Sequence, residues 1–511
     1  ELERRLVSRL TAGCERVVLG YTVRREPFNS EFSQGIENVA WDSHTGFNSA
    51  IFIRTAKLKD FPWNGWMRLG MDTKPAAAWN PIGGFTDPAG RLLWWALGDP
   101  AVIPEPRAGA WMGNRATAVG IEKGAGGTVE IPPDALVVEP GTGAFKEAGP
   151  GRAARSKVTY RITTSLFHDG TRMTAADALY AFSVAQRWGG RAAPGGRAQD
   201  AGVEAATAGV RDALAAFKLL RVEAETRKYT EVTFTYVIPV IDVYLSVPIA
   251  DLGEAGALAP PWSAVGWHVT ALMEEAVRRG VVAFSREEAQ RRGVPWLDLA
   301  RDQKVKDALA GILDELGAKN YIPPALKTLV MADEAQHRWA SLKQFYQRRG
   351  HFLVTNGPYQ LDKWDDGAVT LQVFRDFTYP LGVGSYDRYA VPLRAYVTRA
   401  VARADRIEVQ ADVEEAQRFL RDYKIVREPL AGRPLPLDRR DIPVCRYVVL
   451  DDTGAVAAAG TSQELAGGRF QLSLKGRLKP GAYTVLLALA IRDNWVNTEV
   501  AVVNYRVEAS P

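Results

Sequence analysis

The sequence predicts an α/β body that carries a helical insert, followed by an all-β sandwich at the C-terminal end. Three observations predict this arrangement. A strand, a turn and a capped helix follow one another in residues 156–188, and helical apolar periodicity dominates residues 264–349. After residue 434, short alternating runs are separated by Gly, Asp and Asn turns. With 511 residues, of which 47% are hydrophobic, the chain can form two or three packed domains.

The charge balance argues against a nucleic-acid-binding protein. Lys and Arg number 64 against 59 Asp and Glu, which gives a formal net charge of +5 over the whole chain. The basic residues are interspersed with acidic ones, as where Arg278 and Arg279 follow Glu274 and Glu275. A nucleic-acid footprint requires clustered basic residues, so we expect a solvated mixed surface.

Two cysteines, Cys14 and Cys445, lie far apart in the sequence. They could form one long-range disulfide or remain two separately buried thiols, because pairing cannot be read from spacing. The residues before Cys14 resemble a lipoprotein cleavage box, but the preceding decapeptide is charged rather than apolar, so we do not expect lipidation.

The longest apolar candidate for a membrane span is Val232–Ala250. It carries Pro239, Asp242 and Pro248, whereas a spanning helix needs roughly 20 uninterrupted apolar residues. We interpret it as two buried strands with a break, and expect no transmembrane segment.

Residues 1–63 are expected to form an N-terminal extension that includes a strand at Asn48–Leu58. Alternation at Met67, Leu69 and Met71 predicts the first strand of the main region, 64–433. A loop at 79–81 and a helix at Ala89–Leu97 should follow.

Residues 156–188 contain the most informative local pattern. Alternating apolar residues predict a strand, residues 168–171 supply turn chemistry, and Thr174 with Asp177 forms a capping-box-like helix start. The residues expected on the buried side of the strand and helix are Val158, Tyr160, Ile162, Ala178, Phe182 and Ala185. Residues 187–202, with three arginines, are expected to be either a solvated loop or an anion-contacting lid.

Further signals follow in order. Gly280 should close one helix of the insert, and Ser285 with Glu288 should open the next. Residues 351–374 predict a β-hairpin. A proline-containing linker at 434–443 should precede the sandwich.

Two runs resemble one family. Phe167–Asp177 fits the pattern F-x-D-G-x-x-[LMF]-T-A-x-D, and Asn356–Trp364 fits N-G-x-Y-x-L-x-x-W. The chain in this respect resembles the family 5 extracellular solute-binding proteins, which are peptide- and nickel-binding receptors of bacterial ABC importers. The resemblance implies type II periplasmic-binding-protein lobes in region 64–433, and an immunoglobulin- or fibronectin-like module in 434–511 would be additional to them.

The resemblance also implies where a ligand would bind. Trp79 and Asn80 would face the cleft between the lobes, and Asn356 and Tyr359 would lie near the crossing between them. We add Trp188, at the end of the strand-turn-helix run, to this set. At residues 377–380 the chain departs from the family pattern N-P-x-Y-W, and only about 130 residues remain where the family has a further domain.

No sequence motif predicts an enzyme. The five histidines form no H-x-x-x-H pair, and the sequence contains no G-x-S-x-G elbow, P-loop or kinase signature. We therefore expect no catalytic residues, no metal and no cofactor.

Two functions agree with these observations. The first is a periplasmic solute-binding protein, its signal peptide already removed, that delivers a peptide-like or small polar ligand to an ABC permease. The second is a degenerate binding-protein fold that serves as a non-catalytic accessory subunit and holds other protein subunits of a periplasmic or membrane-associated complex.

Overall fold

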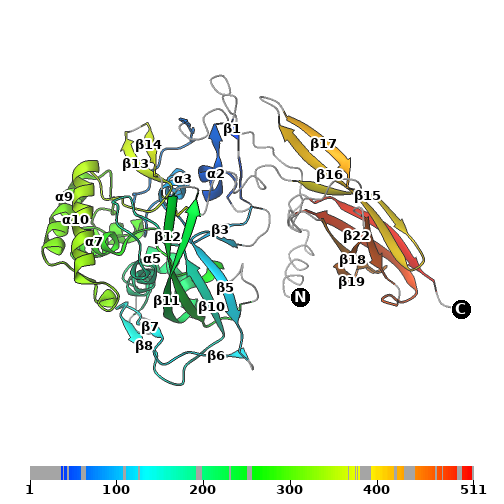
Figure 1. Ribbon diagram of the computed structural model, residues 1–511, viewed down its shortest axis with the longest axis horizontal. Helices are drawn as coiled ribbons and strands as arrows, with labels where there is room; N and C mark the ends of the chain where they lie inside the picture. The colour runs from blue at the N-terminus through cyan, green and yellow to red at the C-terminus, as the bar shows by residue number, and fades with distance from the viewer. Residues whose placement is uncertain are drawn as a thin grey trace.

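The chain folds around two large hydrophobic cores, besides two smaller buried clusters. Figure 1 shows the ribbon of the whole chain. The structure, a computed structural model, describes residues 36–508 except for these gaps: 38, 43–44, 59–64, 107–110, 125–126, 192–197, 230–231, 250–255, 366, 375, 377, 380–392, 419–422, 431–442, 466–468, 475 and 492–497. The larger core runs from Trp79 to Leu361 and combines helices with strands. The second runs from Ala395 to Tyr505 and is formed by strands and the loops beside them, without a helix among its described residues. The predicted mixed helix-and-sheet body and C-terminal all-β region are thus present.

A six-stranded antiparallel sheet is the centre of the α/β body, with strand order β5-β10-β12-β11-β7-β8. Its strands are β5 (Ala116–Glu122), β7 (Leu136–Val138), β8 (Phe145–Glu147), β10 (Ser156–Ile162), β11 (Leu214–Tyr229) and β12 (Val232–Leu245). In β10 every second residue is fully buried, as period-two alternation predicts. The predicted strand at this position is confirmed.

The prediction of two strands with a break within Val232–Ala250 is wrong, because β12 runs unbroken through Pro239. On one side Pro239 is paired with Val222 of β11. On the other side β10 pairs only as far as Val240, so β12 is unpaired by β10 at the proline. A residue without an N–H is tolerated at such a position, since no ladder hydrogen bond is lost there.

The helices of the α/β body share the core of the sheet. They are α3 (Pro88–Leu97), α4 (Ala175–Val184), the π-helix η2 (Ala185–Gly189), α5 (Ala201–Ala213), α7 (Trp267–Arg278), α8 (Arg286–Arg292), α9 (Gln303–Ala318), the 3₁₀ turn η3 (Pro324–Leu326) and α10 (Ala332–Arg349). In Figure 1, α7, α9 and α10 gather beside one another at one end of this body. The predicted helical insert is therefore helical as expected, but its apolar residues belong to the same core as the sheet.

The helix starts and the helix end predicted from capping residues are confirmed. Asp177 accepts a hydrogen bond from the backbone N–H of Thr174 at 2.8 Å, which is one half of the expected capping box. Ser285 accepts from the N–H of Glu288 at 3.2 Å, and Gly280 has the positive φ of +73° that a helix-terminating glycine adopts. Helix α4 is buried on nearly all sides, rather than on the one side predicted from its apolar spacing.

Two predicted strands near the N-terminal end are wrong. Asn48–Leu58 contains a short helix, α2 (Ala50–Thr55), whose start Ser49 caps by accepting from the N–H of Phe52. Only β2 (Lys57–Leu58) is extended, and it pairs with β1 (Ile36–Glu37). The alternating residues 65–71 form no strand, and Trp66 is 83% exposed, because no neighbouring strand pairs with them in the described part of the chain.

The predicted hairpin at 351–374 is confirmed as β13 (Tyr359–Trp364) paired with β14 (Val369–Val373). Four other small strands of the α/β body form two separate pairs. These pairs are β3 (Val102–Pro104) with β4 (Trp111–Gly113), and β6 (Val129–Glu130) with β9 (Ala153–Ala154).

The all-β region consists of two antiparallel sheets whose buried residues form the second core. One sheet contains β15 (Arg394–Ala402), β16 (Arg406–Arg418), β17 (Tyr423–Pro429), β20 (Gln463–Leu465) and β21 (Arg469–Ser473); the other contains β18 (Val444–Leu450), β19 (Val456–Thr461), β22 (Gly481–Ala490) and β23 (Val500–Val507). Residues on both sides of position 434 contribute to this core, so the all-β region begins upstream of the expected module. Cys445 is buried within it, and Cys14 lies outside the described residues.

Candidate functional site

The five residues predicted to contact a ligand do not gather around one cavity. Trp79 is 1% exposed and packs in the large core, where its ring stacks against Phe85 at a centroid distance of 6.3 Å. The guanidinium of Arg301 lies 4.6 Å from the Trp79 ring. The indole N–H of Trp79 is buried without a hydrogen-bond partner in the described part of the chain.

Asn80 is a structural clamp. Its amide group donates to the carbonyl oxygens of Phe284 and Leu297, at 3.2 and 2.9 Å. Its side-chain oxygen accepts from the N–H groups of Ile82 and Gly83, at 3.1 and 2.8 Å. Because both ends of the fully buried amide are occupied, Asn80 fastens the 79–84 loop to the segment around α8 and has no capacity left for a ligand.

Trp188 lies in η2 and is also internal. Its indole N–H donates to Glu274 of α7 at 2.7 Å, and its ring meets Phe284 edge-on at 5.0 Å. Glu274 further accepts from Arg187 at 3.0 Å and from the hydroxyl of Tyr180. Burial, followed by the neighbouring Glu274 carboxylate, raises the pKa of Tyr180 well above its ordinary value.

The region predicted as a loop or lid at 187–202 is therefore different in two respects. Its first residues belong to the π-helix η2, and Arg187 forms an internal ion pair with Glu274. Its last residues begin α5, which Asp200 caps by accepting from the N–H of Gly202 at 3.0 Å. Residues 192–197 lie outside the described residues.

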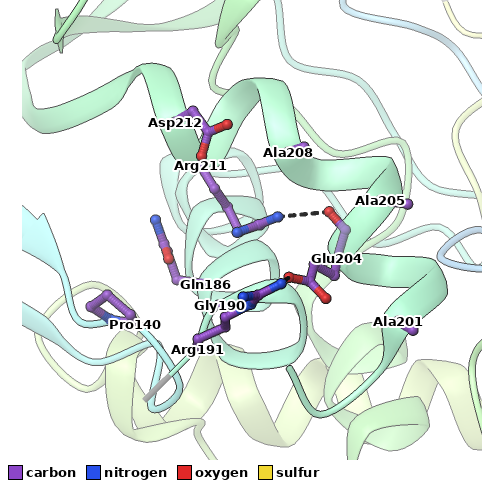
Figure 2. A pocket seen from close by; sticks show the side chains of 10 residues that line it. All are labelled: Pro140, Gln186, Gly190, Arg191, Ala201, Glu204, Ala205, Ala208, Arg211 and Asp212. Carbon is purple, nitrogen blue, oxygen red and sulfur yellow. Dashed lines mark hydrogen bonds and ion pairs between the residues drawn. The ribbon is translucent and has the colours of Figure 1, made fainter. Parts of the chain in front are cut away.

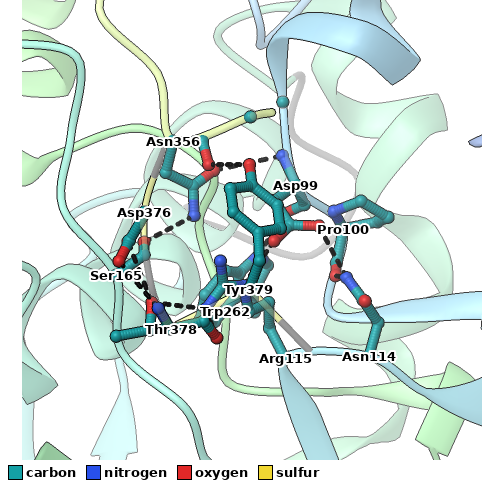
Figure 3. Close-up of polar contacts among 12 residues, drawn as sticks. Asp99, Pro100, Asn114, Arg115, Ser165, Trp262, Asn356, Asp376, Thr378 and Tyr379 are labelled. Carbon is teal, nitrogen blue, oxygen red and sulfur yellow. Dashed lines mark hydrogen bonds and ion pairs between the residues drawn. The ribbon is translucent and has the colours of Figure 1, made fainter. Parts of the chain in front are cut away.

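Asn356 belongs to a buried network centred on Asp99 (Figure 3). Its side-chain oxygen accepts from the N–H of Asp99 at 3.1 Å, and its amide donates to Ser165 Oγ at 3.0 Å. The hydroxyl of Tyr379 donates to the Asn356 carbonyl oxygen at 2.7 Å. The segment that departs from the family pattern is thus bonded into the α/β body through Tyr379.

Asp99 is fully buried between the guanidinium groups of Arg54 and Arg115. Burial by itself raises the pKa of the Asp99 carboxyl, but the two guanidinium groups lower it more, so its pKa lies below the ordinary value. Arg115 also donates to the Thr378 carbonyl at 2.9 Å, and its guanidinium carbon lies 4.7 Å from the Tyr379 ring. The network joins five distant segments of the chain, and its centre, Asp99 with Arg115, is fully buried.

The family-like turn and helix start form a second buried network, which we call the Asp177 centre: Asp169, Asp177, His268 and Arg338. Both carboxylate oxygens of Asp177 accept from Arg338, at 2.7 and 2.8 Å, and the first also accepts from the N–H of Trp267 at 2.7 Å. His268 Nε2 lies 2.9 Å from an Asp169 oxygen. Arg338 is 1% exposed, so the motif residues are bonded to one another rather than to solvent.

Tyr359, the fifth predicted residue, begins β13 opposite Val373 and is half-buried. Burial raises the pKa of its hydroxyl. It shares no hydrogen bond with the other four predicted residues in the described part of the chain. The predicted residues thus lie in four separate places. Trp79 and Asn80 are in the loop before α3, Trp188 is in η2, Asn356 is in the Asp99 network, and Tyr359 is in β13.

A polar cavity lies beside α5 and has a volume of about 670 Å³ (Figure 2). We call it the α5 groove; it is lined by Pro140, Gln186, Gly190, Arg191, Ala201, Glu204, Ala205, Ala208, Arg211 and Asp212. None of the five predicted residues lines it, although Trp188 is two residues from Gln186. Sequence reasoning singled out part of this region only as an arginine-containing loop.

The arrangement of the α5 groove depends on features that have no simple sequence signature. The π-helical turn brings Gln186 and Gly190 to the same edge, and the N–H of Gly190 donates to the Gln186 carbonyl at 3.0 Å. A Cβ on Gly190 would lie only 2.2 Å from that carbonyl oxygen, so glycine is required there. The Gly189-Gly190 pair after Trp188 was the one available signal of a tight turn.

The described residues contain no group of three or more His, Cys, Asp or Glu side chains placed to hold a metal ion. A separate finding concerns membranes. Among the helices of the described ranges, none combines the length and the apolar character needed to cross a bilayer.

Comparisons with known proteins add little. No protein-family model matches the chain, and no curated protein matches it. Among solved structures, the chain is similar to a Se-Met labelled β-glucosidase from Kluyveromyces marxianus, at 10% identity and a TM-score of 0.14. The match covers 69% of this chain and spans 44% of that enzyme's chain. A likeness at this TM-score carries no argument about fold or activity.

Proposed function

We propose that this chain is a non-catalytic solute-binding protein of the family 5 type, and that it holds a peptide-like or small polar ligand in the α5 groove. The observation that carries the proposal is the groove itself. Its volume of about 670 Å³ lies within the roughly 300–1,000 Å³ typical of ligand pockets. It presents two arginines, two acidic residues and one carboxamide to a small ligand.

The location differs from that implied by the family resemblance. Asn80 and Asn356 use their side-chain groups on internal partners, and Trp79 is 1% exposed. Releasing such groups for a ligand would leave buried polar partners unsatisfied, at a cost of about 1–3 kcal/mol for each. A site beside α5 requires no such rearrangement.

A second function is favoured by the same buried residues. If the cleft residues of a solute-binding ancestor became structural, the chain would act as an accessory subunit that holds other protein subunits. The two-sheet all-β region, which we propose to be an immunoglobulin- or fibronectin-like sandwich, would then provide a contact surface. Type II lobes, a periplasmic location and docking to an ABC permease belong to the first proposal.

A thermal-unfolding screen of the purified chain separates the two functions. Amino acids, peptides, sugars and nickel chelates are added at millimolar concentration, and a ligand of the folded state raises Tm by mass action. The solute-binding proposal predicts a concentration-dependent rise with at least one class. A flat response to every class, together with co-purification of other subunits in native mass spectrometry, would contradict it and favour the accessory subunit.

A further inference from the structure

The α5 groove contains a polar side chain that the fold leaves without a partner. Gln186 is only 9% exposed and lines the groove from the π-helix (Figure 2). Its carboxamide makes no hydrogen bond to any residue in the described part of the chain. The buried polar atoms that lack a partner among the described residues do not include its amide atoms, so the amide reaches the open groove and is available to a ligand.

Arg211 presents a fixed cationic group to the same space. Its Nε donates to Thr207 Oγ1 at 3.0 Å, and one Nη donates to the Glu204 carbonyl oxygen at 2.7 Å. These two bonds hold the guanidinium plane, and the other Nη makes no hydrogen bond within the described residues. A held guanidinium with an unused edge suits a carboxylate, which it can meet with parallel N–H donors.

Asp212 presents the opposite charge. Its carboxylate is exposed, and it makes no ion pair or hydrogen bond to the described residues. It lies in the last turn of α5 (Ala201–Ala213), where the helix dipole disfavours a negative charge. A bound ammonium group would neutralise this unfavourable position.

The rest of the lining is neutral in sum and small. Arg191 pairs with Glu204 at 2.7 Å, so these two charges compensate one another. Ala201, Ala205 and Ala208 recur at helical spacing along the wall of α5 and add only methyl groups. The groove therefore leaves one cationic group, one anionic group and one amide available beside a short apolar wall.

We infer that the α5 groove binds a small zwitterion, either a free amino acid or a short unblocked peptide. The ligand carboxylate pairs with Arg211, its ammonium group pairs with Asp212, and Gln186 hydrogen-bonds its polar backbone. This inference rests on the proposed function. A simple anion such as phosphate would gain Arg211 but meet the uncompensated charge of Asp212, and a sugar would leave both charges unused.

Calorimetric titration of the full chain with three related dipeptides tests the inference. The probes are Ala-Ala, N-acetyl-Ala-Ala, which lacks the ammonium, and Ala-Ala-amide, which lacks the carboxylate. Ala-Ala should bind, and each blocked form should bind at least about tenfold more weakly, which corresponds to about 1.4 kcal/mol.

Groove variants should remove these preferences one at a time. In Arg211→Gln, Ala-Ala and its amide should bind equally, and in Asp212→Asn, Ala-Ala and its acetyl form should bind equally. Gln186→Leu should weaken all three probes together. Arg348→Gln and Asp333→Asn, on exposed positions of α10, are the matched controls and should bind as the unmodified chain does.

Each remaining outcome has one meaning. If Ala-Ala binds but the groove variants behave as the controls do, the groove is not the site and the inference is overturned. If the chain binds a sugar or a chelate and no zwitterion, the inference fails while the solute-binding function stands. If it binds no solute of any class, both fail together.

Discussion

The Asp177 centre and the α5 groove are both polar, and both lie in the α/β body, but their polar groups are satisfied differently. In the Asp177 centre, Asp177 accepts from Arg338, Trp267 and Thr174 without contacting solvent. In the groove, the side chains of Gln186 and Asp212 make no hydrogen bond or ion pair with the described residues. The first arrangement has nothing left to offer a ligand, whereas the second has.

Residues that carry a family-like motif and residues that could bind a ligand therefore differ in how their polar groups are used. The residues that resemble a binding-protein family are the ones that bond to each other across long stretches of chain, as Asp177 does with Arg338, 161 positions away. Such residues specify a fold. A site needs polar groups that the fold positions but does not satisfy, and these lie in a region with no recognisable motif.

The largest expected effect comes from breaking the Asp177 centre. Replacing Arg338 by Ala leaves the buried Asp177 carboxylate without its cation, and we expect a loss of about 3–5 kcal/mol in the free energy of unfolding. Urea unfolding measures this loss. Arg348→Ala, on the exposed side of the same helix, is the control and should change stability by less than about 0.5 kcal/mol. Equal losses of stability at the two positions would contradict the prediction that Arg338 stabilises the fold by neutralising Asp177.

Acid should destabilise the α/β body through two buried histidines. Burial lowers the pKa of His168 to about 4 and that of His351 to about 4, from an ordinary 6.5. The unfolded chain therefore binds more protons than the folded one between pH 6.5 and 4. The contribution of the neutral histidines to the free energy of unfolding is fully present above pH 6.5 and is lost as the pH falls through this window. The full loss is about 3 kcal/mol for each histidine.

Unfolding of the chain at pH 7, 5.5 and 4.5 measures this loss. His351 Nδ1 accepts from the N–H of Leu353, and its Nε2 lies 3.3 Å from the Leu361 carbonyl oxygen, an arrangement that suits the neutral ring. His351→Gln should flatten the pH dependence by about half. An unchanged slope in that variant would show that other groups carry the acid sensitivity.

Asn80 should matter less than Arg338, and for folding rather than for binding. Asn80→Ala orphans the buried Leu297 carbonyl oxygen and two partly buried N–H groups, while the Phe284 carbonyl keeps the indole N–H of Trp296; the expected cost is about 1–3 kcal/mol. Asn504→Ala, exposed on β23, is the control. A variant of unchanged stability that no longer binds its ligand would restore Asn80 as a site residue.

The smallest effect on stability is expected in the groove. Asp212→Asn removes a negative charge from the last turn of α5, so we expect no loss and a gain of a few tenths of a kcal/mol. Thermal unfolding without ligand measures it. A loss above about 1 kcal/mol would mean that Asp212 has a structural partner, and would argue that Asp212 stabilises the fold, as Asp177 does, instead of being available to a ligand.

Local patterns in the sequence predicted much of the α/β body. The alternation in β10, the Thr174 and Asp177 helix start and the Ser285 cap depend on neighbouring residues, which a sequence displays directly. Alternation also predicted strands at Asn48–Leu58 and at Met67–Met71, and there it failed, because a strand requires a partner that only tertiary structure supplies. Ser49 instead capped a helix.

The candidate site could not be predicted from local patterns, because it also depends on tertiary structure. Gln186, Arg211 and Asp212 line the same groove only because the π-helix η2 ends at Gly189 and α5 packs beside it. Neither the turn type nor the packing has a periodic signature. Asn80 and Asn356 were expected at a cleft because the resemblance implied it, and only the three-dimensional partners of their amides show what they bond.

The most direct test of this separation between fold residues and site residues uses one chemical change at two positions. Asp177→Asn and Asp212→Asn are compared by thermal unfolding, and for Asp212→Asn the rise in Tm with millimolar Ala-Ala is also measured. We predict that Asp177→Asn lowers Tm sharply, while Asp212→Asn keeps the ligand-free Tm and loses the rise produced by Ala-Ala in the unmodified chain. The account is contradicted if Asp212→Asn lowers the ligand-free Tm as much as Asp177→Asn does, or if it keeps the full ligand-induced rise.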